Sequence, residues 1–205
     1  MTVRRNESWG HPGPLPPGSP VVGSDSALGE LVAAHGPGLV VGLTGGDLFR
    51  TLGGVAGRSR LGTGDSMLLP VDAVRVTLGD AEDDSADRWF VAHLEAHGGT
   101  RWRGPTAVHM NAAFIGDANL GPRAHPGDGL LDLTSGQLTL RDRRRAAARA
   151  GSGTHLPHPG LTTARRPTVE SRFTRPVRVW LDGVEVGRTT RIRSEIVPDA
   201  ITIVV

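Results

Sequence analysis

The sequence predicts an α+β fold, with a short α/β lobe over residues 21–66 followed by a larger β-rich lobe over residues 67–205. In the first range, apolar runs alternate with helix-like segments that begin at turns rich in Gly, Ser and Asp. In the second range, β-branched and polar residues alternate in short segments separated by Gly, Pro and Asp, which is typical of an antiparallel sheet or sandwich. The 29 Gly and 15 Pro among 205 residues favour many turns and short strands over long helices.

The α/β lobe is expected to contain two units in which a strand leads into a helix. The dipeptide Val21-Val22 leads through a polar turn into a helix whose apolar residues recur at helical spacing. The apolar run at 39–43 leads through a second turn into a short helix that Gly53-Gly54 closes. A lobe of this size cannot bury a core on its own, so we expect it to pack on the β-rich lobe or across a homodimer, and we predict self-association.

Three segments stand apart by composition. Residues 1–20 are rich in Pro and Gly, and we expect a flexible arm unless they dock on a neighbouring part of the molecule. The acidic stretch at 79–87 is typical of a solvated hairpin loop rather than of a metal site. A single helix is expected in the β-rich lobe near 140–150, and its five Arg either face solvent or meet phosphate groups of an anionic surface.

Composition excludes several classes of chemistry. Every one of the 23 Lys and Arg residues is an Arg, and Cys and Tyr are absent, so a Lys Schiff base, a thiol nucleophile and a disulfide framework are excluded. The net charge of +2 and the interspersed acidic residues argue against a nucleic-acid partner. No apolar run approaches the ~20 residues of a membrane span, and no apolar stretch follows the first Arg residues as in a secretory signal. We expect a cytoplasmic protein with no transmembrane segment.

Two turns are the main candidate ligand sites. Each lies between a strand and a helix, where backbone N–H groups and the helix dipole can hold an anion and where an acidic side chain can face a metal or a hydroxyl. The alternative is that the polar side chains only cap the helices. If the strands are neighbours in one sheet, both turns lie at their carboxyl ends, where ligands bind in open α/β sheets. The turns offer Ser24, Asp25, Ser26, Thr44, Gly45, Gly46 and Asp47.

Histidines supply further candidates. His109 and Asn111 alternate with apolar residues on a predicted strand, so they share one face, which either lines a cleft or meets water. His155 and His158 are three residues apart in a predicted loop, but without Cys and without an evident third ligand a zinc site is not expected. They are expected to be loop or cleft residues, and no metal site is predicted.

In order along the chain, these segments resemble the bacterial diacylglycerol kinase and lipid kinase family, whose nucleotide-binding motif is distantly shared with NAD kinases. The turn at 44–50 resembles that family's Gly-Thr-Gly-Asn-Asp-Phe-Ala turn, with Asp47 in the place of its Asp, and residues 23–28 resemble a degenerate Gly-Gly-Asp-Gly-Thr motif. The most specific block combines an Asn, a Pro-x-Ala element and Asp-Gly-Leu-Leu-Asp. In this chain it reads Asn111, Gly116, Pro122, Ala124, Asp128, Gly129, Leu130, Leu131 and Asp132.

The resemblance implies a nucleotide-kinase-like α/β lobe packed on a β-sandwich-like lobe, with ATP, Mg²⁺ and a lipid hydroxyl meeting between them. This chain departs from the family pattern in ways that weaken that expectation. The α/β lobe is expected to be truncated, and Ser24, Ser26 and Ala27 stand where the family motif has Gly, Gly and Thr. The family's Asp-Gly-Glu base turn reads Asp-Gly-Val at 182–184, and Glu185 comes one residue late, on the opposite face unless a bulge corrects the register.

Three functions are compatible with a chain that keeps some of the family's motifs and departs from others. The favoured one is a kinase-fold protein that no longer uses ATP and binds or transforms a small organic or amphipathic metabolite in the remnant cleft. The alternatives are a compact lipid kinase that uses ATP and Mg²⁺, and a noncatalytic interaction protein in which the Arg-rich helix contacts an anionic surface or partner. The candidate catalytic residues are Asp47, Asp25, His109 and Glu185. The candidate ligand-binding residues are Ser24, Ser26, Thr44, Gly45, Gly46, Asn111, Asp128 and His155.

Overall fold

The structure, a computed structural model, describes residues 9–55, 57–79, 88–99 and 103–205. The acidic stretch expected to form a loop at 79–87 lies outside the described residues apart from Gly79. The helices are α1 (Asp25–His35), α2 (Asp47–Thr51) and α3 (Leu140–Ala150). The strands are β1 (His11–Pro12), β2 (Val21–Val22), β3 (Leu39–Leu43), β4 (Met67–Leu78), β5 (Arg88–Phe90), β6 (His93–His97), β7 (Thr106–Met110), β8 (Phe114–Ile115), β9 (Ala118–Asn119), β10 (Leu131–Gly136), β11 (Leu161–Arg166), β12 (Thr168–Leu181) and β13 (Val184–Val204).

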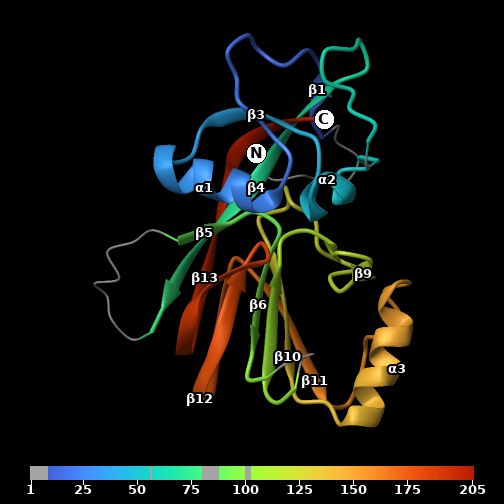
Figure 1. Ribbon diagram of the computed structural model, residues 1–205, viewed down its shortest axis with the longest axis vertical. Coiled ribbons are helices and arrows are strands. Elements are labelled where there is room, and N and C mark those ends of the chain that lie inside the picture. The colour runs from blue at the N-terminus through green and yellow to red at the C-terminus, as the bar shows by residue number, and fades with distance from the viewer. Residues whose placement is uncertain (1–8, 56, 80–87, 100–102) are drawn as a thin grey trace.

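One large sheet runs through both lobes, and it confirms the α+β prediction. Its strands lie in the order β1-β4-β13-β12-β6-β7-β10-β11, and all neighbours in this order are antiparallel. Strand β3 joins the sheet parallel to the end of β13, β2 pairs with β3, and β5 pairs with β4. Figure 1 shows α1 and α2 in the upper half of the molecule, the long strands descending below them, and α3 at the lower right beside β11.

The two strand-helix units of the α/β lobe form as the sequence predicts. Ser24 caps α1 because its Oγ accepts a hydrogen bond from the N–H of Ala27 at 3.3 Å. The helix ends before Gly36, whose φ of 76° is in the left-handed region that favours glycine. Helix α2 has no cap from its own N-cap residue, Gly46, and takes its cap from a distant side chain described below.

A single apolar core joins the α/β lobe to the β-rich lobe. Its buried members come from α1, β3 and α2 on one side and from β4 and the end of β13 on the other: Leu28, Val32, Val41, Leu43, Leu48, Phe49, Leu69, Val71, Ala73, Ile201 and Ile203. Each fully buried side chain of this size stabilises the fold by about 1.5–3 kcal/mol. Of the two expected ways to bury this lobe, packing on the β-rich lobe is the one seen. Residues near the C-terminus, assigned from the sequence to the β-rich lobe, thus lie against the α/β lobe.

A second core lies lower in the molecule, between strands of the curled sheet. It contains Phe90, Leu94, Leu131, Val179, Leu181 and Ile192 together with other buried residues of β4, β6, β12 and β13. The face of β6 and β7 that carries Leu94 and His109 points into this core, because both residues are fully buried. The opposite face of the same strands carries His93, Glu95 and Val108.

Residues 9–13 lie against the sheet, where the sequence predicts a flexible arm over 1–20. The indole of Trp9 packs on the upper core and donates a hydrogen bond from Nε1 to the carbonyl of Pro70 at 2.9 Å. His11 and Pro12 pair with Leu68 and Met67 of β4. The aromatic side chain supplies the docking contact that a Pro- and Gly-rich segment needs in order to become ordered. Among the described residues, no helix is long and apolar enough to cross a bilayer.

Candidate functional site

The two candidate turns pack directly on each other. A Cβ added to Gly45 would come within 2.6 Å of the carbonyl oxygen of Gly23, and one added to Gly46 would come within 2.4 Å of the Asp25 carboxylate. Asp25 accepts hydrogen bonds from the N–H groups of Asp47 at 2.5 Å and Leu48 at 3.2 Å. Asp25 is therefore the cap of α2, and the glycines allow this close approach.

Burial governs the charge of Asp25. Removal from water, followed by the nearby charge of Asp182, raises the pKa of Asp25 to about 7, although its two backbone N–H donors favour the charged form. Burial also raises the pKa of Asp182, against the opposing effects of His93 and of three backbone N–H donors. Two carboxyl groups thus share a dry space beneath α1.

The side chain of Asp182 forms hydrogen bonds with the backbone at the start of β6. Asp182 forms a two-residue hairpin with Gly183, in which φ is 47° at Asp182 and 82° at Gly183, as a type I′ turn requires. Its carboxylate accepts hydrogen bonds from the N–H groups of Val91, Ala92 and His93 at 2.9–3.0 Å. The Asp-Gly pair of the predicted base turn therefore positions the strand that carries His93.

Asp47 joins the lobes. Its Oδ2 lies 3.0 Å from His93 Nε2, and the N–H of Gly116 donates to both of its carboxylate oxygens at 2.9 and 3.1 Å. Gly116 lies between β8 and β9, and its carbonyl accepts a hydrogen bond from Arg50 of α2 at 2.5 Å. The side chain of His93 is only 5% exposed. Asp47 thus fixes a buried imidazole rather than facing open solvent.

His93 and Glu95 are adjacent on one face of β6. His93 Nδ1 lies 3.8 Å from Glu95 Oε1, too far for a hydrogen bond, and Nδ1 has no hydrogen-bond partner among the described residues. Burial lowers the pKa of His93, but the hydrogen bond to Asp47 and the charges of Asp182, Glu95 and Asp47 outweigh it, so the pKa is raised. Burial also raises the pKa of Glu95, although the charges of His93 and His97 lower it. The pKa of each group therefore lies above its ordinary value.

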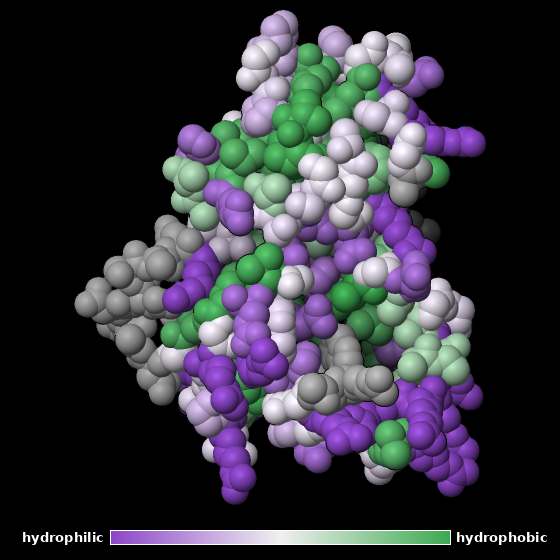
Figure 2. Space-filling view, in the orientation of Figure 1, coloured by the Kyte–Doolittle hydropathy of each residue, from purple (hydrophilic) through white to green (hydrophobic). Residues whose placement is uncertain are grey.

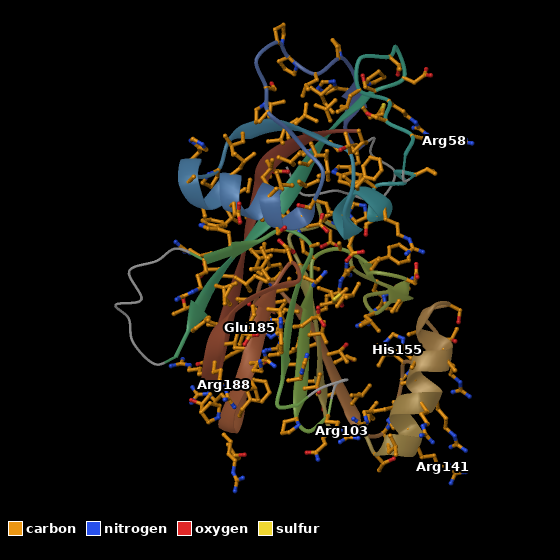
Figure 3. The ribbon with its side chains drawn as sticks, in the orientation of Figure 1. Arg58, Arg103, Arg141, His155, Glu185 and Arg188 are labelled. Atoms are coloured by element: carbon orange, nitrogen blue, oxygen red, sulfur yellow. The ribbon has the colours of Figure 1, made fainter. Side chains whose placement is uncertain are left out.

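A cavity of about 360 Å³ opens beside Glu95, between α3 and the sheet. Its walls are mostly apolar side chains of β7, the β8–β9 hairpin, the segment before α3, α3 itself and the start of β11: Val108, Ile115, Ala118, Leu120, Leu138, Ala146, Ala147, Ala150 and Leu161. Its polar groups are few, which is typical of sites for small organic ligands: Glu95, Thr106, Thr134, Arg143 and His155. Figure 3 shows His155 beside α3, with Arg141 at the lower end of the same helix.

The turns do not fit the Mg²⁺ and triphosphate that the family resemblance implies. The N–H groups at the start of α2, which would bind a phosphate, already donate to Asp25. The carboxylate oxygens of Asp25, Asp47 and Asp182 already accept N–H donors, which leaves fewer of their lone pairs for a metal ion. In the described ranges, no group of three or more His, Asp or Glu is arranged to hold a metal.

His109 and Glu185 lie elsewhere than predicted. His109 is fully buried and its two ring nitrogens lie 2.8 Å from Ser194 Oγ and 2.9 Å from Ser171 Oγ, so it cannot partner Asp47. The histidine bound to Asp47 is His93. A bulge interrupts the pairing of β12 and β13 beyond Glu185, yet the Glu185 carboxylate forms an exposed ion pair with Arg178. Neither residue joins the candidate site.

Most of the other predicted residues make hydrogen bonds that stabilise the fold, and one of them lines the cavity. The amide of Asn111 donates to the carbonyls of Asp72 and Val91 and is fully buried, so it braces the start of β6. The Asp128 carboxylate accepts a hydrogen bond from the N–H of Leu130 and forms an ion pair with Arg165. Ser24 caps α1, and Thr44 donates to the carbonyl of Val22. Only His155, of the predicted set, lines the cavity, and burial lowers its pKa.

The sequence interpretation missed His93, Glu95 and the supporting role of Asp182. The signal was present in residues 93–97, which read His-Leu-Glu-Ala-His and place three titratable side chains on one face of a strand. The sandwich curls so that this face, rather than the one carrying His109, lies under α3.

Comparison with known proteins settles the family. Residues 83–205 match the family model described as the YegS C-terminal NAD kinase beta sandwich-like domain. The chain belongs to this family. The result confirms the resemblance to diacylglycerol and lipid kinases, and the matched range carries His93, Glu95, Asp182 and the cavity. No curated protein matches the chain.

Solved structures similar to this member of the YegS C-terminal family come from Bacillus anthracis strain Sterne. Two are described as proposed diacylglycerol kinases, with TM-scores of 0.63 and 0.68 and identities of 12% and 13%, each covering 89% of this chain and 76% of that chain. A third, described as a diacylglycerol kinase, has a TM-score of 0.61 and 14% identity over 89% of this chain and 74% of that chain. At these identities the likeness establishes the fold.

Proposed function

We propose that this lipid-kinase-fold protein binds a small amphipathic organic molecule in the cavity between α3 and the sheet and does not use ATP. The observation that carries the proposal is the cavity itself, which is apolar along α3 and has Glu95 at its sheet side, with His93 Nδ1 3.8 Å behind the Glu95 carboxylate. A ligand would place its apolar part against the alanines of α3 and its polar group near Glu95. Proton transfer to or from that polar group is the chemistry that such a pair can supply.

The test is a titration of the full chain with the neutral fluorescent probe N-phenyl-1-naphthylamine. Ala146 lines the cavity, whereas Ala148 on the same helix is exposed and does not. We expect Ala146→Phe to fill the cavity and weaken probe binding at least tenfold, and Ala148→Phe to leave it within twofold. Equal effects of the two variants, or no probe binding by the unmodified chain, would contradict the proposal.

The alternative of a lipid kinase is favoured by the two acidic residues, Asp25 and Asp47, that meet where two strand-helix turns pack together. Calorimetric titration with ATP and Mg²⁺ separates the two functions. We expect no heat of binding up to millimolar ATP, because the N–H groups of α2 are already occupied. Binding that Asp47→Asn abolishes would favour the kinase.

The interaction alternative is favoured by the exposed side of α3. Arg141, Arg144, Arg145 and Arg149 are exposed there, with Leu140 52% exposed beside them. Figure 2 shows a strongly hydrophilic region over this helix, at the lower right. Binding to anionic vesicles that falls with added salt, and that replacement of these Arg by Gln removes, would show a peripheral membrane contact. Self-association, also a prediction, is tested by sedimentation velocity, and a monomer at high concentration would contradict it.

A further inference from the structure

We propose that a depression in the lower part of the β-rich lobe is a docking site for an acidic peptide segment of a partner protein. The depression has a volume of about 800 Å³ and shares no lining residue with the cavity under α3, so the inference is independent of the proposed function. Its charged lining residues are Arg103, Arg175 and Arg188, and none of the described residues that line it is Asp or Glu. Figure 3 shows Arg103 and Arg188 in the lower part of the sheet, away from α1 and α2.

Three separate segments bring these exposed arginines together. Arg103 lies just before β7, and Arg188 is a residue of β13. Arg175 lies in β12, where the pairing with β13 shifts register between Arg172 and Val177. An irregularity of this kind turns side chains away from their regular positions on a strand. The fold thus gathers like charges from distant parts of the sequence around one depression.

The neighbouring carboxylate does not neutralise this charge. Glu185 interacts electrostatically with Arg188, but its carboxylate oxygens accept hydrogen bonds from Arg178. Arg188 lies directly opposite Arg178 in the ladder, where like charges are destabilising. Within the described ranges, Arg103 and Arg175 form no ion pair. An anionic partner would therefore offset a repulsion that the fold leaves in place.

The shape of the depression favours a peptide over other anions. Between the arginines it is lined by glycines and by apolar side chains: Gly98, Gly99, Gly104, Pro105, Pro176 and Val177. An extended peptide can lay its backbone on such a surface while its carboxylates pair with the guanidinium groups. A compact anion would contact only part of a space of this size, and a flat bilayer surface would not fill a depression. The partner segment therefore carries several Asp or Glu residues within a short stretch.

The test is binding of the full chain to a fluorescein-labelled peptide of four Asp-Glu repeats, measured by fluorescence anisotropy at low salt. A labelled peptide of four Asn-Gln repeats is the neutral control of equal length. We expect the acidic peptide to bind and the neutral peptide not to bind. The affinity for the acidic peptide should fall as NaCl is added, because salt screens exposed charges.

Two triple variants with the same loss of charge locate the binding site. The depression variant carries Arg103→Gln, Arg175→Gln and Arg188→Gln. The control variant, on the exposed side of α3 and outside the depression, carries Arg141→Gln, Arg144→Gln and Arg145→Gln. We expect the depression variant to bind the acidic peptide about tenfold more weakly, because three exposed ion pairs are lost together, and the control variant to stay within about twofold. Both should keep the thermal unfolding midpoint of the unmodified chain, since all six positions are exposed.

Three results of the peptide titration would overturn the proposal: no binding of the acidic peptide, equal weakening by the two triple variants, or full affinity in the depression variant. Binding to phosphatidylglycerol vesicles that the depression variant loses, without binding of the peptide, would assign a bilayer to the site and overturn the proposal as well. Self-association in sedimentation velocity that only the depression variant abolishes would support it. That result would name the acidic stretch at 79–87 of a second copy as the partner segment.

Discussion

Asp47 and His93 are 46 residues apart in the sequence, yet Asp47 Oδ2 lies 3.0 Å from His93 Nε2. The contact joins the start of α2 to the start of β6, and so joins the α/β lobe to the sheet. A buried pair of this kind both orients the imidazole and couples the two lobes energetically.

We expect the coupling to appear in a double-mutant cycle. Asp47→Asn and His93→Asn, measured singly and together by urea unfolding, should show an interaction free energy of about 1–2 kcal/mol. The comparison cycle pairs Asp47→Asn with His97→Asn, which lies at the far end of β6 and stacks on Trp180. That cycle should be additive within about 0.5 kcal/mol, and equal coupling in both cycles would refute a specific contact.

Asp182→Ala should be strongly destabilising. It leaves the N–H groups of Val91, Ala92 and His93 without their acceptor, and it places Ala at a φ of 47°. We expect a loss of about 3 kcal/mol or more in the free energy of unfolding. Asp65→Ala, at an exposed position, should change it by less than about 0.5 kcal/mol. A small effect of Asp182→Ala would mean that water replaces the carboxylate.

The pKa of about 7 at Asp25 predicts a pH dependence of stability. The folded state binds the Asp25 proton more tightly than the unfolded state, whose pKa is 3.8. The stabilising contribution is therefore complete below pH 4 and is lost as the pH rises through 7. Compared with Asp25→Asn, the unmodified chain should lose about 1.4 kcal/mol per pH unit between pH 4 and 7. If the unfolding free energies of the unmodified chain and of Asp25→Asn changed equally across that range, the raised pKa would be ruled out.

His109 should give the opposite dependence of stability on pH, with stability falling as the pH falls. Burial lowers the pKa of His109 to about 3, so the folded state holds a neutral imidazole while the unfolded chain gains a proton below pH 6.5. Relative to His109→Leu, the unmodified chain should lose about 2 kcal/mol between pH 6.5 and pH 5. The same variant should bind N-phenyl-1-naphthylamine normally, because His109 faces the lower core. Impaired probe binding in a folded His109→Leu protein would place His109 back in the site.

Much of the fold could be predicted because it depends on local patterns. The β-branched segments after residue 67, the Gly- and Asp-rich turns, and the Asp182-Gly183 hairpin all follow rules that act within a few residues. The Arg-rich helix at 140–150 agrees in its bounds with α3. The family resemblance also rested on short local blocks, and the match over residues 83–205 confirms it.

The sequence alone therefore determined the fold class, the positions of the turns and the family. Only the tertiary structure decided which face of β6 and β7 meets a cavity, because alternation places polar residues on both faces and the curl of the sheet chooses between them. It also decided that Asp25 caps α2 and that Asp47 binds His93 rather than His109. These contacts join residues more than 20 positions apart, and burial of their charges, a property of the assembled core, sets their chemistry.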